Sequence, residues 1–198
     1  MRLAIMGGTF NPIHIGHLVC AEEAVAQYGL EQVLFMPTGF PPHKEIQGGA
    51  NAEHRYLMAA IATAANPRFE VSRYEIEKKQ ICYTVDTVRH FREKMPAVEL
   101  FFITGADSVL EILEWKDPSE LLEMATLIAS TRSGYPLDKL SKATGRFLKE
   151  NRVAVMEVPA IGVSSSMIRE RVACGRSIKY LVPEGVEQFI NKEGLYRS

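Results

Sequence analysis

The sequence predicts an α/β fold, in which a doubly wound, mostly parallel sheet carries a small helical extension at its C-terminal end. Short apolar runs alternate with amphipathic segments along the chain, and this alternation is typical of a parallel sheet whose crossovers are helices. Most of the runs are nearly all apolar, as strands covered on both faces require. The chain has 198 residues, with no internal repeat and no long linker, so we expect one domain over residues 1–198.

The expected strands and helices follow from these patterns. The strands cover residues 3–6, 33–36, 69–72, 100–104, 127–130 and 153–158. Between them, apolar residues recur at helical spacing in three stripes. The stripes consist of Leu18, Ala21, Val25 and Tyr28, of Leu57, Met58, Ile61 and Ala65, and of Val85, Val88, Phe91 and Met95. Asn51 and Thr84 precede the second and third stripes and are expected to be N-caps.

The chain beyond the last strand is expected to be helical. Residues 164–174 form one predicted helix. Val186, Phe189 and Ile190 mark a final short helix, which Gly194 would terminate. Residues from about 164 to 198 therefore form a helical C-terminal subdomain of the Rossmann-like domain.

Composition excludes several classes of protein. Lys plus Arg number 23 and Asp plus Glu 24, a formal charge of −1, so a surface that coats nucleic acid is not expected. Cys20, Cys82 and Cys174 form no CxxC pair and indicate reduced thiols. The N-terminal apolar stretch is too short for a signal peptide, and no run approaches the roughly 18 apolar residues of a membrane span. We expect a cytoplasmic protein without membrane contact, for which a homo-oligomer is compatible with the sequence.

The loop after the first strand is the first candidate site, because ligands of doubly wound sheets bind beyond the carboxyl ends of the strands. Two glycines let the backbone approach a ligand, and the N-terminus of the following helix attracts an anion. His14 and His17, three residues apart, can both point into the same site and donate to phosphoryl oxygens. The loop matches neither GxxxxGK[ST] nor GxGxxG. A zinc site is disfavoured because a third ligand is missing, and no protein metal site is expected.

A second candidate loop follows the last strand. Ser164, Ser165 and Ser166 supply caps and backbone N–H groups at a helix start. Arg169, one turn later, can reach a phosphate with its forked donors. The simpler interpretation is a capped helix with a solvated arginine. Because both loops lie at the same edge of the predicted sheet, we expect them to form one anion site.

These two segments resemble the two ATP signatures of the nucleotidylyltransferase superfamily, a glycine-and-threonine loop with His-x-x-His and a Ser-Ser/Thr-x-x-Ile-Arg turn. His14-Ile15-Gly16-His17 is also the form found in class I aminoacyl-tRNA synthetases, which carry a lysine-rich signature that this chain lacks. The full ordered set of motifs resembles the bacterial nicotinate-nucleotide adenylyltransferase family. The resemblance implies that His14, His17 and Arg169 contact the ATP phosphates. It also implies an ATP site that includes Gly7, Gly8, Thr9, Phe10, Asp107, Ser164, Ser165 and Ser166.

The same resemblance assigns a second set of residues to the mononucleotide. Lys44, in a rigid Pro-Pro-His-Lys turn, and Arg132 would lie near its phosphate. Trp115 would stack on the pyridine ring, and Tyr83 with Thr84 would border that ring. A lone tryptophan is otherwise most often a core residue.

The activity implied is adenylyl transfer from ATP to nicotinate mononucleotide, giving deamido-NAD and pyrophosphate in NAD biosynthesis. We expect Mg²⁺ as the cofactor, bound mainly through ATP, because Mg²⁺ seldom needs a dedicated protein cage. Two alternatives remain open at this point. The acceptor could be a different phosphate, such as a phosphopantetheine or a polyol phosphate, or the chain could be a nucleotide-binding regulator without turnover.

Overall fold

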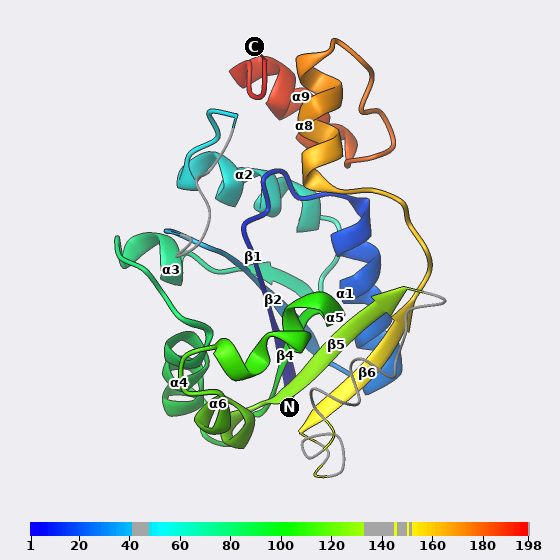
Figure 1. The fold of residues 1–198 in the computed structure, drawn as a ribbon. Coiled ribbons are helices and arrows are strands. Elements are labelled where there is room, and N and C mark those ends of the chain that lie inside the picture. The colour runs from blue at the N-terminus through cyan, green and yellow to red at the C-terminus, as the bar shows by residue number, and fades with distance from the viewer. Residues whose placement is uncertain (41–47, 133–144, 146–149, 151, 198) are drawn as a thin grey trace. The chain divides into compact units, whose positions relative to one another are not determined.

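The computed structural model describes residues 1–40, 48–132, 145, 150 and 152–197. Within these residues, six strands form one sheet in the order β3-β2-β1-β4-β5-β6 (Figure 1). The strands are β1 (Arg2–Gly8), β2 (Gln32–Pro37), β3 (Phe69–Val71), β4 (Glu99–Gly105), β5 (Thr126–Arg132) and β6 (Val153–Val158). This is the strand order of a Rossmann-like doubly wound sheet, which confirms the predicted fold class.

Each predicted strand corresponds to an observed one, and its apolar residues form the core. β1 pairs with β4 in parallel, with Leu3 opposite Leu100 and Ile5 opposite Phe102. β4 pairs with β5, and β5 with β6, also in parallel. The side chains of these strands are largely buried. Burial of both faces is why a continuous apolar run, without alternation, identified the strands.

Contacts divide the chain into two compact units. Unit 1 consists of Met1–Gly7, Cys20–Leu34 and Tyr83–Ala160. Unit 2 consists of Gly8–Val19, Phe35–Cys82 and Ile161–Ser198, and therefore holds the predicted C-terminal helices. Helix α1 (Ile15–Tyr28) contributes to both units.

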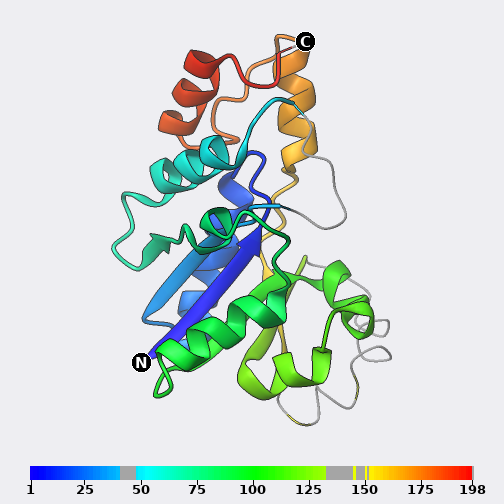
Figure 2. The ribbon, with the colours of Figure 1, turned by 90° about the vertical axis from the view of Figure 1, so that its left-hand side faces the viewer.

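Unit 1 contains β4, β5 and β6 together with α4 (Thr84–Lys94), α5 (Ala106–Leu110), the short helix η1 (Ile112–Glu114) and α6 (Pro118–Met124). Helices α4 and α6 pack against each other (Figure 2). The predicted N-cap of α4 was wrong by one residue, because Tyr83 occupies the extended cap position and Thr84 is the first helical residue. The prediction chose Thr84 because threonine is a preferred N-cap residue, whereas the side chain of Tyr83 makes no cap hydrogen bond.

Unit 2 contains α2 (Ala52–Thr63), α3 (Tyr74–Glu77), α8 (Ser165–Ala173) and α9 (Glu184–Glu193). Figure 2 shows α9 against α2, and a Cβ at Gly185 would lie only 2.6 Å from Ile61 Cγ2. The predicted caps Asn51 and Ser164 are confirmed, since each side chain accepts a backbone N–H of its helix. Gly194 ends α9 with φ 65°, as predicted.

The apolar stripe predicted for α2 was partly wrong. Leu57 and Ile61 are 36% and 37% exposed, and the buried residues of this helix are Arg55, Met58, Ala59 and Thr63. The reason is Arg55, a completely buried cation whose guanidinium binds main-chain carbonyls. Among the described residues, no helix combines the length and the apolar character needed to cross a membrane.

Candidate active site

The glycines at the end of β1 are required by aromatic rings beside them. A Cβ at Gly8 would lie 2.9 Å from the ring of Phe10, and one at Gly7 would lie 2.9 Å from the ring of Phe102. Phe10 itself is buried, with φ 47°, and its ring lies against Phe35 and edge-on to His17. Phe10 therefore supports His17 from inside the protein.

His14 and His17, predicted from their spacing, lie together at the start of α1. Their rings stack with centroids 3.7 Å apart and an interplanar angle of 25°. The main-chain N–H of His14 donates to Nδ1 of His17 over 3.1 Å. Because Nδ1 accepts a hydrogen bond, the proton of the neutral His17 ring lies on Nε2. Nε2 is therefore the nitrogen that can donate to a ligand.

The surroundings of His17 favour its neutral form. Burial of the ring holds the pKa of His17 well below its usual value, and the neighbouring His14 lowers it further. At neutral pH this imidazole is consequently a hydrogen-bond donor without a positive charge. A neutral donor can stabilise a phosphoryl oxygen by a hydrogen bond, and a formal positive charge must then come from another residue, such as the predicted Arg169.

Donors from α2 and α8 hold carbonyl oxygens of the histidine loop, the segment from Gly8 to His17 that contains both histidines. Arg55 donates to the carbonyl of Thr9 over 2.8 Å. Arg169 donates to the carbonyl of Asn11, and the Ser165 hydroxyl to that of Pro12, both over 2.8 Å. The two predicted ATP segments are thus joined directly in unit 2, although residues 11 and 169 are 158 positions apart.

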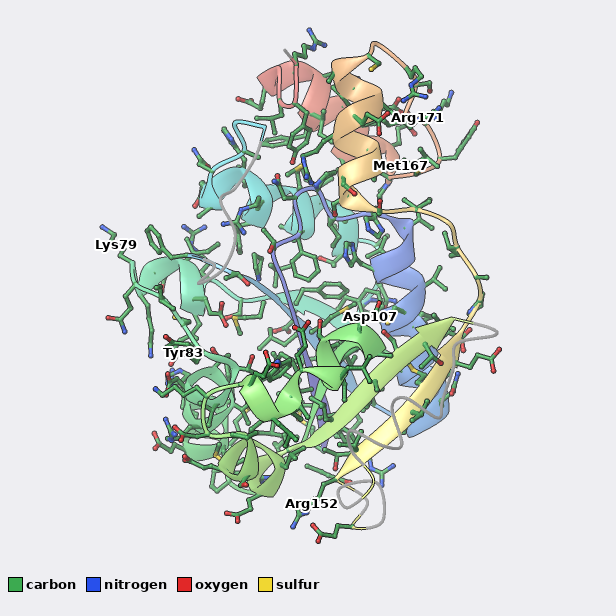
Figure 3. The ribbon with its side chains drawn as sticks, viewed as in Figure 1. Lys79, Tyr83, Asp107, Arg152, Met167 and Arg171 are labelled. Atoms are coloured by element: carbon green, nitrogen blue, oxygen red, sulfur yellow. The ribbon has the colours of Figure 1, made fainter. Side chains whose placement is uncertain are left out.

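The serine turn at the start of α8 is compact. Ser164 Oγ accepts the N–H of Met167 over 3.2 Å as the N-cap, and it lies 3.1 Å from Ser166 Oγ. Met167 and Arg171 are labelled on this helix in Figure 3. The predicted residues Ser164, Ser165 and Ser166 therefore place hydroxyl groups and a helix N-terminus at the segment that binds the histidine loop.

The remaining predicted ATP residue and the predicted ring-binding tryptophan lie in unit 1. Asp107 is an exposed residue in the first turn of α5 (Figure 3). Trp115 follows η1 and is partly buried. Its ring stands at 85° to that of Phe102, with centroids 6.4 Å apart. This edge contact leaves at least one face of the indole uncovered by Phe102, as stacking on a heteroaromatic ring requires.

Charged side chains surround the start of α4, where Tyr83 and Thr84 lie. Lys116 Nζ lies 5.0 Å from the centre of the Tyr83 ring and 3.0 Å from a carboxylate oxygen of Asp86. Arg89 binds Asp86 and also Glu120, each over 2.8 Å. Partial burial opposes the charged form of Asp86, but the hydrogen bonds from Lys116 and Arg89 outweigh it and lower its pKa. The network fixes Lys116 beside Tyr83, which is exposed.

The structure does not describe the side chains of the two residues predicted to lie near the mononucleotide phosphate. Lys44 lies outside the described residues. Arg132 is the last residue of β5, and its side chain lies outside the described part of the chain. Within that part, no group of three or more His, Cys, Asp or Glu side chains could hold a metal ion.

Comparison with known proteins identifies the family. A family model described as Cytidylyltransferase-like matches residues 5–171. A protein of Moorella thermoacetica described as "Probable nicotinate-nucleotide adenylyltransferase" is 51% identical over 199 residues, covering 99% of this chain and 92% of that protein. One from Saccharopolyspora erythraea with the same description is 49% identical and covers 100% of this chain and 90% of that protein. The chain belongs to the nicotinate-nucleotide adenylyltransferase family.

Solved structures resemble this adenylyltransferase-family chain in fold. The Plasmodium falciparum nicotinic acid mononucleotide adenylyltransferase complexed with NaAD superposes with a TM-score of 0.79 at 18% identity, covering 98% of this chain and 97% of that chain. The same enzyme complexed with APC gives a TM-score of 0.78 at 18% identity and covers 98% and 96%. At this identity the likeness concerns the fold.

Three residues that hold the histidine loop of this adenylyltransferase-family chain were missed in the sequence. Arg55 was not among the predicted site residues, although it occupies the same face of α2 as the buried Met58 and Ala59. Asn11 and Tyr196 bind each other from opposite ends of the chain, 185 positions apart. No local spacing connects such a pair, so no pattern in the sequence signals it.

Proposed function

We propose that this chain transfers the adenylyl group of ATP to nicotinate mononucleotide, giving deamido-NAD and pyrophosphate in NAD biosynthesis. The observation that carries the proposal is the direct joining of the His14–His17 loop to the serine turn of α8 by Ser165 and Arg169. Imidazole, hydroxyl and guanidinium donors gathered there suit a polyphosphate. The names of the relatives support the choice of acceptor.

The reaction is an in-line displacement at phosphorus. An oxygen of the mononucleotide phosphate forms a bond to the α-phosphorus of ATP, while the bond from that phosphorus to the α,β-bridging oxygen breaks and pyrophosphate leaves. The attacking phosphate is already ionised at neutral pH, so no general base is needed. Catalysis then rests on positioning two anions and on stabilising charge on the leaving group.

Named residues supply these effects in the proposal. His17 donates from Nε2 to a phosphate oxygen of ATP, and His14, stacked on it, supports the same contact. Arg169 contributes the formal positive charge, with one N–H retained by Asn11. The turn of residues 163–166 and the loop backbone of Gly8, Thr9 and Phe10, all in unit 2, hold the adenosine in the proposal. The family resemblance adds Gly7 and Asp107 of unit 1 to the residues that bind ATP.

Mg²⁺ enters this proposal with ATP. The donors that gather at the two joined segments are imidazole, hydroxyl and guanidinium groups, which suit phosphate oxygens better than a hard cation that prefers oxygen ligands. When bound through the triphosphate and water, Mg²⁺ neutralises part of the phosphate charge. The protein residues bind and orient the nucleotide around it.

Unit 1 supplies the proposed pyridine-binding residues. Trp115 stacks on the pyridine ring, and Tyr83 and Thr84 border it. Lys44 and Arg132 neutralise the mononucleotide phosphate. The Lys116–Asp86 ion pair supports this assignment, because it fixes a cation beside the Tyr83 ring.

Pyrophosphate release tests the activity. The protein is mixed with ATP and Mg²⁺ and with nicotinate mononucleotide, nicotinamide mononucleotide or phosphopantetheine in separate reactions. We expect the fastest release with nicotinate mononucleotide, and deamido-NAD as the product by mass spectrometry. Preferred turnover of phosphopantetheine would replace the acceptor, and the absence of release with all three would support a binding protein without turnover.

Trp115→Ala tests the stacking role. We expect KM for the mononucleotide to rise about tenfold or more, as loss of one aromatic stacking contact implies, with KM for ATP within about twofold. Trp115→Phe should restore part of the affinity. Leu113→Ala is a matched control, because Leu113 lies on the neighbouring η1 and is 63% exposed. An equal increase in KM for both substrates would show that Trp115 acts in packing and not in stacking on the mononucleotide.

A further inference from the structure

Tyr196 is fixed in one place, beyond the end of α9. It is 4% exposed, and its main-chain N–H donates to the carbonyl of Gly48 over 3.1 Å. A Cβ at Gly48 would lie 2.5 Å from Cδ1 of the Tyr196 ring, so the ring occupies space that only glycine leaves free. Gly48 also has φ 82°, which further favours glycine there. The position of the tyrosine hydroxyl is therefore set by packing and by a main-chain contact.

The hydroxyl of Tyr196 reaches the histidine loop. It donates to Oδ1 of Asn11 over 2.8 Å, in a buried contact. Burial raises the pKa of Tyr196, and this outweighs the opposing effects of Arg169 and Arg55. The hydroxyl consequently keeps its proton and remains a donor at neutral pH.

Asn11 is the point at which two different donors meet. Its side chain accepts from Tyr196, and its main-chain carbonyl accepts from Arg169, each over 2.8 Å. The contact from Tyr196 holds the side chain of Asn11, and the contact from Arg169 holds its main chain. Three residues further on, the main-chain N–H of His14 sets the ring of His17. A shift of Asn11 would therefore be transmitted to the histidine pair.

We propose that Tyr196 is a positioning residue of adenylyl transfer, whose hydroxyl holds Asn11 so that the loop from Gly8 to the His14–His17 stack keeps the conformation that binds ATP. This inference rests on the proposed function for the transfer reaction and its acceptor, whereas the role of Tyr196 in ATP binding does not depend on either. It assigns Tyr196 to the binding of ATP and not of the mononucleotide, although the residue itself touches no substrate in the proposal. Its loss should weaken ATP binding more than mononucleotide binding.

Tyr196→Phe removes the hydroxyl and keeps the ring and the N–H contact to Gly48. We expect KM for ATP to rise about tenfold, the size of effect that loss of one buried hydrogen bond produces. KM for nicotinate mononucleotide should stay within about twofold. The Kd of an ATP analogue with a methylene group between the α- and β-phosphorus, measured by calorimetry, should rise in parallel with KM for ATP.

Tyr28→Phe is the matched control. It also removes one hydroxyl hydrogen bond, the donation from Tyr28 to the carbonyl of Val155 over 3.2 Å. We expect Tyr28→Phe to leave both KM values and the analogue Kd within about twofold of the unchanged protein. If Tyr196→Phe behaves like Tyr28→Phe, or raises both KM values equally, the positioning role is excluded.

Asn11→Ala provides a second, independent variant. Because it removes the acceptor of the same hydrogen bond, the double variant with Tyr196→Phe should bind the ATP analogue no more weakly than Asn11→Ala alone. Full additivity of the two changes would overturn the inference. The calorimetric arm needs no acceptor, so a protein that shows the expected analogue Kd values but no turnover of nicotinate mononucleotide would overturn the proposed function and leave the inference standing.

Discussion

At the scale of single residues, His17 is the side chain whose chemistry the structure defines most closely. Its Nδ1 accepts the N–H of His14, the rings of His14 and Phe10 lie against it, and burial lowers its pKa. These features leave Nε2–H as a single oriented donor. A preoriented donor is worth most in the transition state, where charge moves onto the leaving pyrophosphate.

His17→Ala should therefore lower kcat by about 10²- to 10³-fold, the usual result of removing one oriented donor. We expect the thermal unfolding midpoint to change by only a few degrees, since the loop remains bound by Arg55, Ser165 and Arg169. His17→Gln, which can place an N–H near the position of Nε2, should recover part of the rate. Turnover of His17→Ala close to that of the unchanged protein would remove His17 from the mechanism.

At the scale of elements, the start of α2 shows how a local cap supports the site. Asn51 accepts the N–H of His54 over 2.8 Å, and His54 Nδ1 accepts the N–H of Asn51 over 3.4 Å, which forms a capping box. The helix that begins there carries Arg55, the donor to Thr9. The stability of helix α2 therefore helps to keep Arg55 in place against the histidine loop.

Asn51→Ala should lower the free energy of unfolding by about 1 kcal/mol, as loss of a side-chain N-cap typically does. Urea unfolding followed by circular dichroism measures this difference. Asn51→Ser is the matched control, because serine also caps helices, and it should cost at most a few tenths of this amount. A loss as large in Asn51→Ser as in Asn51→Ala would show that the effect does not come from the cap.

The elements also show which features the sequence could predict. Strands buried on both faces were found because their apolar runs are continuous, and the caps Asn51 and Ser164 because capping is local. His14, His17 and Arg169 were found as site candidates from short spacings and the family resemblance. The buried face of α2 was predicted only in part, through Met58, because a buried cation, Arg55, lies on it where an apolar residue is expected. Tyr196 was missed because its partner Asn11 is 185 positions away.

At the scale of the whole molecule, the formal charge of −1 counts every histidine as neutral. It therefore does not show that a side chain can take up its proton at a different pH in the folded protein than in the unfolded chain. His17 is such a group, because its pKa is lowered well below the ordinary value of 6.5 in the folded protein. As pH falls through 6.5, the unfolded chain takes up a proton on His17 before the folded protein does. Proton uptake by the unfolded state favours unfolding, so the stability present above pH 6.5 is lost as pH falls below it.

We therefore expect the free energy of unfolding to fall between pH 7 and pH 5, with a contribution from His17 of at most about 1.4 kcal/mol per pH unit. Urea unfolding at half-unit intervals measures the slope. His17→Gln should reduce the slope in this range, while above pH 7 the two proteins should differ by a constant amount, since His17 is then neutral in both states. An unchanged slope in His17→Gln would mean that the ring takes up its proton at the same pH in the folded protein as in the unfolded chain, and the stacked pair of His14 and His17 would then be open to solvent.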